Sequence, residues 1–423
     1  MRHLYTMLWS LALPLVLVRL WWRGRKEPGY RAHWTERLGM YGVRGAPVHT
    51  LWVHAVSVGE TRAAEPLVDA LLAAYPASRI VLTHMTPTGR ATGKALFARH
   101  GERLVQAYLP YDIPILVRRF IRHFAPRICV LMETEVWPNL IAVCAAATPA
   151  VPVALVNARL SERSLRRGRR FGSLMTDAAE ALALVAAQTE FDAARVRQLG
   201  ASTVEVTGSI KFDVVVPEAA RETGAWLRAR SGSRPVLLCA STRDGEEAMI
   251  LGACAALLAL PARPLLVIVP RHPQRFDDVA ALVAARGLSL QRRSQLVDGA
   301  VDADVLLGDS MGEMFAYYAA CDLAFIGGSL LPLGGQNLIE ACALGKPVLT
   351  GPHTFNFALA TEAAIAAGAA LCIHDGDELI RFAGALFEDT PQRLAMGRHA
   401  LAFSQRHRGA TVRTVGLLRH IIH

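Results

Sequence analysis

The sequence predicts an α/β protein made of two doubly wound, Rossmann-like domains, each with a parallel sheet covered by helices on both faces. Apolar runs of strand length alternate with alanine- and leucine-rich helical patterns along nearly the whole chain. These runs are apolar throughout rather than at every second residue, which is typical of strands buried on both faces. At 423 residues the chain is also too long for one ordinary domain, and its 52% hydrophobic content can fill two cores.

We expect six strands in each half of the chain, with helices between them. The first six are Thr50–Val56, Arg79–Thr83, Ile128–Met132, Val153–Val156, Leu184–Ala187 and Val204–Val206. Helical patterns among them cover Thr61–Ala74, Gly89–Arg99, Pro114–His123 and Asn139–Ala147. The second six strands are Val236–Cys239, Leu265–Val269, Val305–Leu307, Leu323–Ile326, Val348–Thr350 and Ala370–Ile373. The polar, Pro- and Gly-containing segment Gly208–Pro235 is the expected junction.

The N-terminal segment is long and apolar enough to attach the chain to a membrane. Leu4–Trp22 approaches the roughly 20 residues that cross a bilayer. A tryptophan pair and basic residues typical of the cytoplasmic membrane interface follow, namely Trp21, Trp22, Arg23, Arg25 and Lys26. Pro14 and Arg19 weaken a simple spanning interpretation. A spanning anchor, a helix lying in the interface and a helix packed on the domain therefore all stay open.

Charge and cysteine content limit the function classes. The net charge of +10 favours anionic partners such as phosphorylated substrates or acidic lipid. Nucleic acid ranks last, because no nucleic-acid-reading motif is present and aromatic residues make up only 7% of the chain. The seven cysteines are scattered without a Cys-x-x-Cys pair, which indicates a reduced compartment and neither a disulfide framework nor a zinc site.

Ligands of doubly wound sheets bind at the carboxyl ends of strands, and acidic residues follow two strands of the first half. Glu60 follows the first strand, where it can serve as a general base or only complement a helix dipole. Glu133 and Glu135 follow a later strand. A helix cap would need one acid rather than two, so we expect at least one of them to be a site residue. Lys211 lies between apolar neighbours near the junction, as a site residue or a solvated charge.

The second half carries four strand ends that suit an anionic ligand, and the fourth is followed by a glycine-rich turn. Arg271 and His272 follow one strand, and Arg271 can fork onto a phosphate. Gly308–Met314 follows another strand and opens a helix. Ser241 or Thr242 at a third strand end is expected to cap a helix, with Glu246 or Glu247 completing a capping box.

The glycine-rich turn Gly327–Ala341 joins a strand to a helix, with Asn337 and Glu340 expected in the first turn. Its N–H groups can seat a nucleotide phosphate, and Glu340 can accept hydrogen bonds from ribose hydroxyls. The alternative is a turn that is glycine-rich for steric reasons alone.

Taken together, these motifs resemble the 3-deoxy-D-manno-octulosonic acid (Kdo) transferases of lipopolysaccharide synthesis. The motifs occur in the family's order, as Val-Ser-Val-Gly-Glu60, Met-Glu133-Thr-Glu-Val-Trp-Pro-Asn, Gly-Ser-Ile-Lys211-Phe-Asp, Ser-Thr-Arg-Asp-Gly-Glu-Glu, Pro-Arg271-His272-Pro, Gly-Asp-Ser-Met-Gly312-Glu313-Met314 and Gly-Gly-Gln-Asn337-Leu-Ile-Glu340. Two positions depart from the family pattern. Gln336 stands where a histidine is expected and Ile339 where a leucine is expected. Gln336 cannot titrate, so proton transfer at that position is in doubt.

The resemblance implies a GT-B glycosyltransferase whose two Rossmann-like domains face a cleft. It implies inverting transfer of Kdo from CMP-Kdo to a hydroxyl of a lipid A precursor, lipid IVA, at the cytoplasmic face of the inner membrane. No metal or other cofactor is expected. The implied divisions are a membrane anchor at 1–25, an acceptor domain at 26–209 and a CMP-sugar domain at 210–423, whose final helices can pack back on the acceptor domain.

The resemblance also implies roles for individual residues. The implied catalytic residues are Glu60 as the base, Glu133 and Lys211. Lys211, Arg271 and helix N-termini would stabilise the departing phosphate in place of a metal ion. The implied substrate-binding residues are Arg271, His272, Gly312, Glu313, Met314, Asn337, Leu338, Ile339 and Glu340. The alternatives are another membrane-associated GT-B nucleotide-sugar:lipid transferase and a non-catalytic nucleotide-binding regulator.

Overall fold

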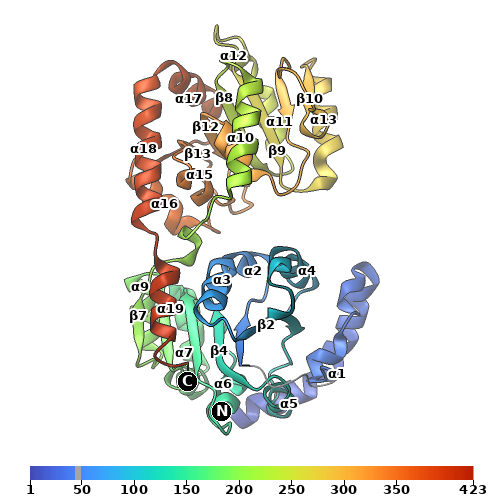
Figure 1. Ribbon diagram of the computed structural model, residues 1–423, viewed down its shortest axis with the longest axis vertical. Helices are drawn as coiled ribbons and strands as arrows, with labels where there is room; N and C mark the ends of the chain where they lie inside the picture. The colour runs from blue at the N-terminus through green and yellow to red at the C-terminus, as the bar shows by residue number, and fades with distance from the viewer. Residues whose placement is uncertain (43–48, 423) are drawn as a thin grey trace. The chain divides into compact units, whose positions relative to one another are not determined.

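The computed structural model describes residues 1–42 and 49–422, and the chain forms two compact units (Figure 1). The first unit comprises Met1–Asp213 and Arg408–His423, and the second comprises Val214–His407. Each unit is built around a seven-stranded sheet in which every printed strand pair is parallel. The predicted fold of two doubly wound α/β halves is therefore confirmed.

The first sheet has the strand order β3-β2-β1-β4-β5-β6-β7. Its strands are β1 Thr50–His54, β2 Arg79–His84, β3 Leu104–Tyr108, β4 Pro126–Met132, β5 Val153–Ala158, β6 Leu184–Ala187 and β7 Val204–Val206. The α-helices of this unit are α1 Arg2–Lys26, α2 Val58–Ala63, α3 Glu65–Ala74, α4 Pro87–Leu96, α5 Pro114–Phe124, α6 Pro138–Ala145, α7 Glu162–Arg170, α8 Ser173–Glu180, α9 Glu190–Gln198 and α19 Ala410–Leu418. Short 3-10 helices lie at η1 Pro28–Tyr30, η2 Trp34–Leu38, η3 Ala98–Arg103 and η4 Ile210–Phe212.

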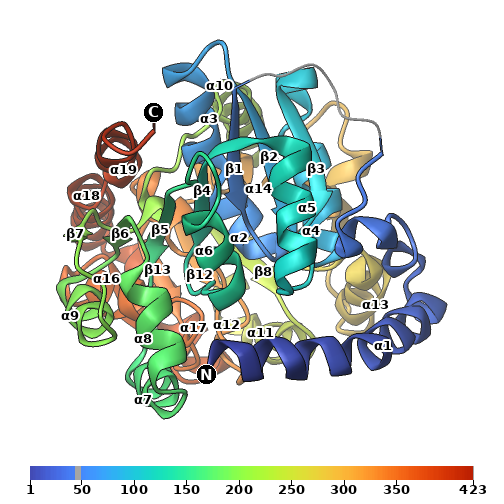
Figure 2. The ribbon, with the colours of Figure 1, turned by 90° about the horizontal axis from the view of Figure 1, so that it is seen from below.

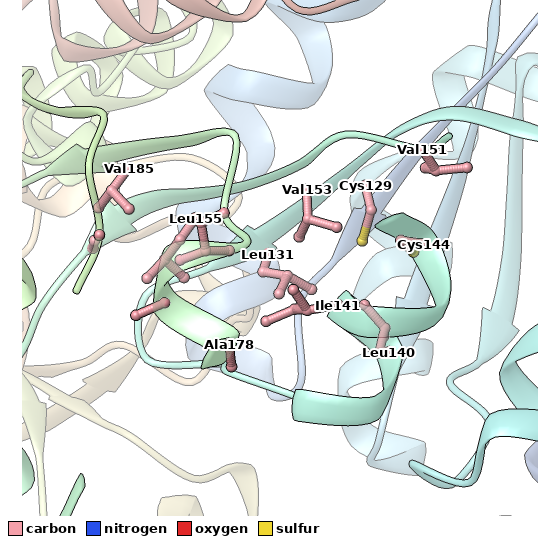
Figure 3. Packing of buried hydrophobic residues seen from close by; sticks show 14 of the residues in the cluster. Cys129, Leu131, Leu140, Ile141, Cys144, Val151, Val153, Leu155, Ala178 and Val185 are labelled. Carbon is pink, nitrogen blue, oxygen red and sulfur yellow. The ribbon is translucent and has the colours of Figure 1, made fainter. Parts of the chain in front are cut away.

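Both faces of the first sheet are buried, which explains why its strands are apolar throughout. Along β4, Cys129 and Leu131 enter one core cluster, while Ile128 and Val130 enter the cluster on the opposite face. Figure 3 shows the first cluster, where β4 and β5 pack against helix α6. Side chains on both faces exclude water, so polar groups are left to the ends of the strands.

Two elements of the first unit differ from the sequence-based expectation. The strand β3 was not predicted, because Gln106 interrupts its apolar pattern; in the structure the Gln106 amide hydrogen-bonds to buried His84. The helix predicted over Thr61–Ala74 is two helices, α2 and α3, that meet at Ala64. Pro66, at the start of α3, cannot donate a backbone hydrogen bond to a preceding turn, so one continuous helix is disfavoured.

The second sheet has the strand order β10-β11-β9-β8-β12-β13-β14. Its strands are β8 Val236–Thr242, β9 Leu265–Pro270, β10 Leu290–Arg292, β11 Val305–Leu307, β12 Leu323–Ile326, β13 Val348–Thr350 and β14 Ala370–Cys372. The α-helices are α10 Glu218–Ser231, α11 Glu246–Ala253, α12 Ala255–Leu258, α13 Phe276–Ala285, α14 Met314–Ala320, α15 Ile339–Ala343, α16 Ala358–Ala366, α17 Gly376–Glu388 and α18 Thr390–Arg406, and the 3-10 helices are η5 Pro273–Arg275 and η6 Arg293–Gln295. The short edge strand β10 was not predicted.

The segment expected to be a junction, Gly208–Pro235, contains the 14-residue helix α10. This helix packs closely on α14, because a Cβ atom at Gly224 would lie only 2.9 Å from the Ala316 carbonyl oxygen. Most of the segment therefore belongs to the second unit, and the units divide between Asp213 and Val214.

The last helix of the chain, α19, completes the core of the first unit. Its buried side chains Val415 and Leu418 join the cluster that contains Leu67 of α3. The Asp213 carboxylate accepts hydrogen bonds from the backbone N–H groups of Gly409 and Thr411. The helix is thus fixed both by apolar packing and at its N-terminal end.

The fold makes α19 a test of how far the C-terminal segment stabilises the first unit. Leu418→Ala removes a fully buried side chain and should lower the free energy of unfolding by about 2–5 kcal/mol. Val412→Ala, on the same helix but 75% exposed, should change it by less than about 0.5 kcal/mol. Urea denaturation of both variants measures the difference, and equal midpoints would show that α19 is not part of that core.

Candidate functional site

In the first sheet, polar side chains collect where the strand order reverses. The sheet begins at β1 and grows outward in both directions, so β1 and β4 flank the switch point. Glu60 follows β1, Glu133 follows β4, and Asn157 lies at the end of neighbouring β5. Because these strands are parallel, their carboxyl ends meet at one edge, the usual ligand position in such sheets.

Glu133 and Lys211 form an ion pair at this edge. The Lys211 ammonium nitrogen lies 2.8 Å from Glu133 Oε1, and both side chains are largely buried, at 25% and 16% exposure. Asn157 supports both residues, because its Nδ2 lies 3.4 Å from Glu133 Oε1 and its Oδ1 accepts the Ile210 N–H at 3.1 Å. Two predicted site residues that are 78 positions apart in the sequence are therefore held together.

Glu133 and Asn157 both adopt left-handed backbone conformations, with φ of +57° and +52°. For residues other than glycine this costs about 1–3 kcal/mol each and is found mostly at functional sites. The strain is consistent with two strand ends shaped to present these side chains.

Glu60 is poised to exchange a proton near neutral pH. Its Oε2 accepts the Val56 N–H at 2.8 Å, and its Oε1 lies 3.4 Å from the Ser57 hydroxyl. Burial, together with the smaller effect of the negative charges of Glu135 and Glu133, raises the pKa of Glu60 to about 7, although those two hydrogen bonds act in the opposite direction. A carboxylate with such a pKa is suited to general-base catalysis.

His54 was not predicted as a site residue, whereas Glu135 was considered together with Glu133. Both lie at the strand ends near Glu60, and Glu135 contributes to the pKa of Glu60. His54 is fully buried at the end of β1, and burial lowers its pKa to about 3, so its ring is neutral. Its Nε2 is 4.0 Å from Glu135 Oε2, too far for a hydrogen bond. Burial also raises the pKa of Glu135. Among the missed residues, Asn157 carried the clearest signal, a polar side chain at the end of an apolar strand.

In the second sheet the four ligand-competent loops leave four adjacent strands. The strands β11, β9, β8 and β12 are neighbours in that order, and the chain order reverses between β8 and β12. The segments that follow them are Gly308–Met314, Arg271–His272, Arg243–Glu246 and Gly327–Glu340. All four predicted segments therefore lie along one edge of the sheet.

Glu246 fastens two of these loops together. Its fully buried carboxylate accepts hydrogen bonds from the backbone N–H groups of Arg243 at 2.9 Å and of Gly328, Ser329 and Leu330 at 2.6, 2.9 and 3.0 Å. The predicted side-chain cap at Ser241 or Thr242 is wrong, because Gly245, with φ of +93°, is the N-cap of α11 and no side chain caps it. Glu246 and Glu247 instead make tertiary contacts. The spacing of residues in the sequence could not distinguish such contacts from a helix cap.

The glycine residues of this turn permit close backbone approach. A Cβ atom at Gly327 would lie 2.6 Å from the Ser241 carbonyl oxygen. Gly334 and Gly335 have φ of +95° and +70° and are buried. The steric explanation for the glycines is therefore correct at Gly327, and it does not exclude a ligand at the same edge.

Asn337 and Glu340 are joined directly. Asn337 Nδ2 donates to Glu340 Oε1 at 3.0 Å, and Asn337 Oδ1 accepts the Ile339 N–H at 3.0 Å. The helix α15 begins at Ile339, so Asn337 lies just before its first turn and Glu340 within it. The Leu338 and Ile339 side chains are 2% and 1% exposed, so only their backbone groups are available to a ligand.

The remaining predicted residues follow β9 and β11. His272 is exposed, and partial burial followed by the positive charges of Arg243 and Arg271 lowers its pKa, which places three basic groups near one another. Gly312, with φ of +85°, is exposed, and Met314 begins α14. An anionic ligand would be attracted to this edge by the two arginines.

The Glu313 carboxylate is already engaged within the second unit. It accepts hydrogen bonds from Arg293 Nη2 at 2.7 Å and from the Ser310 hydroxyl, whose oxygen is 2.6 Å from the Tyr317 hydroxyl. Arg293 follows β10, a strand that the sequence pattern did not reveal, so its link to Glu313 could not be foreseen.

Among residues 1–42 and 49–422, no group of three or more His, Cys, Asp or Glu side chains is arranged to hold a metal ion. Six of the seven cysteines are buried and all are unbridged.

Comparison with known proteins gives a consistent match. A family model described as 3-deoxy-D-manno-octulosonic-acid transferase (kdotransferase) matches residues 32–214. The 3-deoxy-D-manno-octulosonic acid transferase of Bordetella pertussis is 49% identical over 427 residues, covering 99% of this chain and 98% of that protein. The transferase of the same name from Haemophilus influenzae is 37% identical, again over 99% and 98% of the two chains.

Solved structures resemble the fold. UDP-GlcNAc 2-epimerase from Neisseria meningitidis aligns with a TM-score of 0.59 at 15% identity, covering 88% of this chain and 100% of its own. A glycosyltransferase from Rickettsia africae aligns with a TM-score of 0.57 at 12% identity, covering 88% and 98%. At these identities the likeness concerns architecture alone, and it agrees with the predicted GT-B arrangement of two Rossmann-like halves.

The buried carboxylate of Glu246 yields a stability prediction. Glu246→Gln places an NH₂ group against backbone N–H donors and should lower the free energy of unfolding by about 2–4 kcal/mol. Glu222→Gln, exposed on α10, should leave it unchanged within about 0.5 kcal/mol. Thermal and urea denaturation measure both changes; a Glu246→Gln variant as stable as its control would mean that the four hydrogen bonds do not hold the loop.

Proposed function

The chain belongs to the 3-deoxy-D-manno-octulosonic acid (Kdo) transferase family, and from that premise we propose that it transfers Kdo from CMP-Kdo to a hydroxyl of a lipid A precursor. The reaction would take place at the cytoplasmic face of the inner membrane, with inversion at the anomeric carbon. The observation that carries the proposal is Glu60, whose carboxyl group has a pKa of about 7 and lies at the switch point of the first sheet.

Glu60 is proposed as the general base. An alcohol is a poor nucleophile until its proton is removed in the transition state. In this scheme the acceptor oxygen forms the new bond to the anomeric carbon of Kdo, and the hydroxyl proton passes to the Glu60 carboxylate. The bond from the anomeric carbon to the CMP phosphate breaks, and its electron pair leaves with CMP.

Glu133 and Lys211 are proposed to support this step as a pair. Lys211 neutralises Glu133 at 2.8 Å, which limits the negative charge close to Glu60. Without that ammonium group, the Glu133 carboxylate would raise the pKa of Glu60 further above neutrality. Glu133 is also suited to stabilise positive charge that develops on the sugar ring.

The CMP-sugar is proposed to bind at the carboxyl edge of the second sheet. Arg271 would pair with the phosphate, and the Glu340 carboxylate, oriented by Asn337, would accept ribose hydroxyl hydrogen bonds. Gly312, exposed and left-handed, would let the ligand approach the backbone before α14. His272 and Glu313 would line the same edge, with Glu313 held by Arg293.

Membrane attachment is proposed through α1, the one helix among the described residues that is long and apolar enough to cross a bilayer. Basic side chains on the first unit would favour anionic lipid or the phosphates of the acceptor. The exposed arginines of α7 are Arg163, Arg166, Arg167, Arg169 and Arg170.

Transfer itself is tested by mass spectrometry of a synthetic lipid A precursor incubated with the full chain and a CMP-Kdo generating system. A mass increase of one or more Kdo units is expected, and it should survive EDTA because arginine side chains can replace a metal ion at the phosphate. Inhibition by CMP but not by UDP would distinguish this function from a UDP-sugar transferase. An unmodified acceptor, or activity lost with EDTA and restored by magnesium, would contradict the corresponding part of the proposal.

Two substitutions should separate the base from the donor site. Glu60→Gln keeps the side-chain shape but cannot accept the proton, so turnover should fall about 100-fold or more while CMP affinity is retained. Glu340→Ala should instead weaken CMP binding by about 10-fold or more through lost ribose hydrogen bonds. Titration calorimetry with CMP and initial rates measure the two effects. Exposed Glu102→Gln is the control, and a near-normal rate for Glu60→Gln would exclude Glu60 as the base.

The raised pKa of Glu60 predicts how the rate depends on pH. The base acts only when deprotonated, so kcat/KM should fall about tenfold per pH unit below pH 7 and level off above it. Glu135→Gln removes a negative charge that raises this pKa, so the acidic limb should move to lower pH. A profile that Glu135→Gln leaves unmoved would show that the limb does not report Glu60.

A further inference from the structure

The helix α1 is apolar on two opposite faces, and only one of them is free. Side chains on the first face pack on the first unit at helical spacing, namely Tyr5, Thr6, Trp9, Leu13, Val16 and Leu17. Side chains on the other face are 49–73% exposed, namely Leu4, Met7, Leu8, Leu11, Leu15, Val18 and Trp22. At about 100° per residue the two sets lie on opposite sides of the helix.

Polar contacts fix the start of α1 to the first unit. The Tyr5 hydroxyl donates to Asp112 Oδ2 at 3.0 Å, and the Thr6 hydroxyl donates to Asn139 Oδ1 at 3.0 Å. Asp112 is itself buried, and it accepts the backbone N–H groups of Asn139 and Leu140 at the start of α6. Both hydrogen bonds to α1 are part-buried, and their partners lie more than 100 residues away in the sequence.

Packing continues along the rest of the helix. The Trp9 ring stacks on Tyr111 at 5.9 Å between centroids, and Leu13, Val16 and Leu17 pack against the apolar cluster of Tyr111 and neighbouring residues. At the far end the Arg31 guanidinium donates to the Trp21 carbonyl oxygen at 3.2 Å. Figure 2 shows α1 running along one side of the first unit instead of projecting away from it.

The length of this contact is incompatible with a helix that crosses the bilayer. From Tyr5 to Leu17 the face packed on the first unit extends about 18 Å, which is more than half of the roughly 30 Å thickness of the hydrocarbon core. If α1 crossed the bilayer while docked, the surface around Asp112 and Asn139 would have to enter hydrocarbon, where charged and polar groups are strongly disfavoured.

We propose that α1 lies in the plane of the membrane interface, docked on the first unit, with its exposed leucine face inserted among the lipid acyl chains of an anionic membrane. Charge complementarity identifies anionic lipid as the occupant, because the exposed basic residues Arg19, Arg25 and Lys26 lie beside the leucine face. Trp21 and Trp22 are exposed near the C-terminal end of α1, and tryptophan is typical of the membrane–water interface. The proposal rests on the membrane-bound function above and deepens it by placing the first unit directly on the lipid surface.

Cross-linking of Thr6→Cys with Asn139→Cys tests whether α1 remains docked on the membrane. Thr6 Oγ1 and Asn139 Oδ1 are 3.0 Å apart in the native pair, so cysteines at these two positions face each other across the contact. Cys372→Ser removes the one exposed native cysteine in the part of the chain that the structure describes. Leu11→Cys with Asn139→Cys is the matched control, because Leu11 is on the exposed face.

The full-length variants are bound to vesicles of 30% anionic lipid and oxidised. We expect the Thr6–Asn139 pair to form an intramolecular disulfide in the vesicle-bound fraction, at least ten times more than the Leu11 control. Binding to vesicles without this disulfide would overturn the in-plane docking while leaving membrane attachment intact. Absence of vesicle binding would overturn the proposed membrane-bound function itself.

A second readout separates the in-plane helix from a spanning one and from a dimer contact. His3→Cys in the Cys372→Ser background should react with a membrane-impermeant maleimide added outside the vesicles, to the same extent with and without detergent. Reaction that requires detergent would mean that the N-terminus crosses the membrane and would refute the proposal. Dimerisation through α1 with no vesicle binding would assign the leucine face to a second copy, which equally refutes it.

Discussion

Burial of both sheets on both faces is the constraint on which the remaining features depend. Side chains above and below each strand are surrounded by helices, so a charged group within a strand would be left without water or partners. The carboxyl ends of the strands are the positions where the chain leaves the apolar layers. Glu133 and Arg271 come directly after such ends, and Glu60 and Glu340 lie in the helices that follow them. The burial that forms the cores therefore also gathers the charged side chains into the segments that leave the strands.

A second set of residues holds these ends in position without being obvious reactants. Asn157 ties Glu133 to the segment that carries Lys211, and Glu246 ties the β8 loop to the glycine turn after β12. Both act through backbone N–H groups that would otherwise be unpaired in a buried setting. Their hydrogen bonds fix the positions of the loops that they join. Precise positioning of this kind is what a binding or catalytic site requires of its supporting residues.

Sequence reasoning succeeded where the physical signal is local. Apolar runs such as Leu184–Ala187 and Leu323–Ile326 were predicted with their observed bounds. It missed β3, where Gln106 breaks the pattern because its partner His84 lies on another strand. It took Glu246 for part of a helix cap, because partners 82 to 84 residues away leave no trace in spacing. Glu133 and Lys211 were each predicted as site residues, but their ion pair and its support by Asn157 required coordinates.

The return of α19 to the first unit has a consequence for biosynthesis. Val415 and Leu418 belong to the same core cluster as Leu67, although the entire second unit is made between them. A ribosome releases the chain from its N-terminal end, so this core stays incomplete until α19 has been synthesised, while the second unit can already have folded. The contacts of highest sequence separation then form last. During that interval the apolar surface of α3 that α19 later covers is exposed to water, so the incomplete first unit is more prone to aggregation than the finished one.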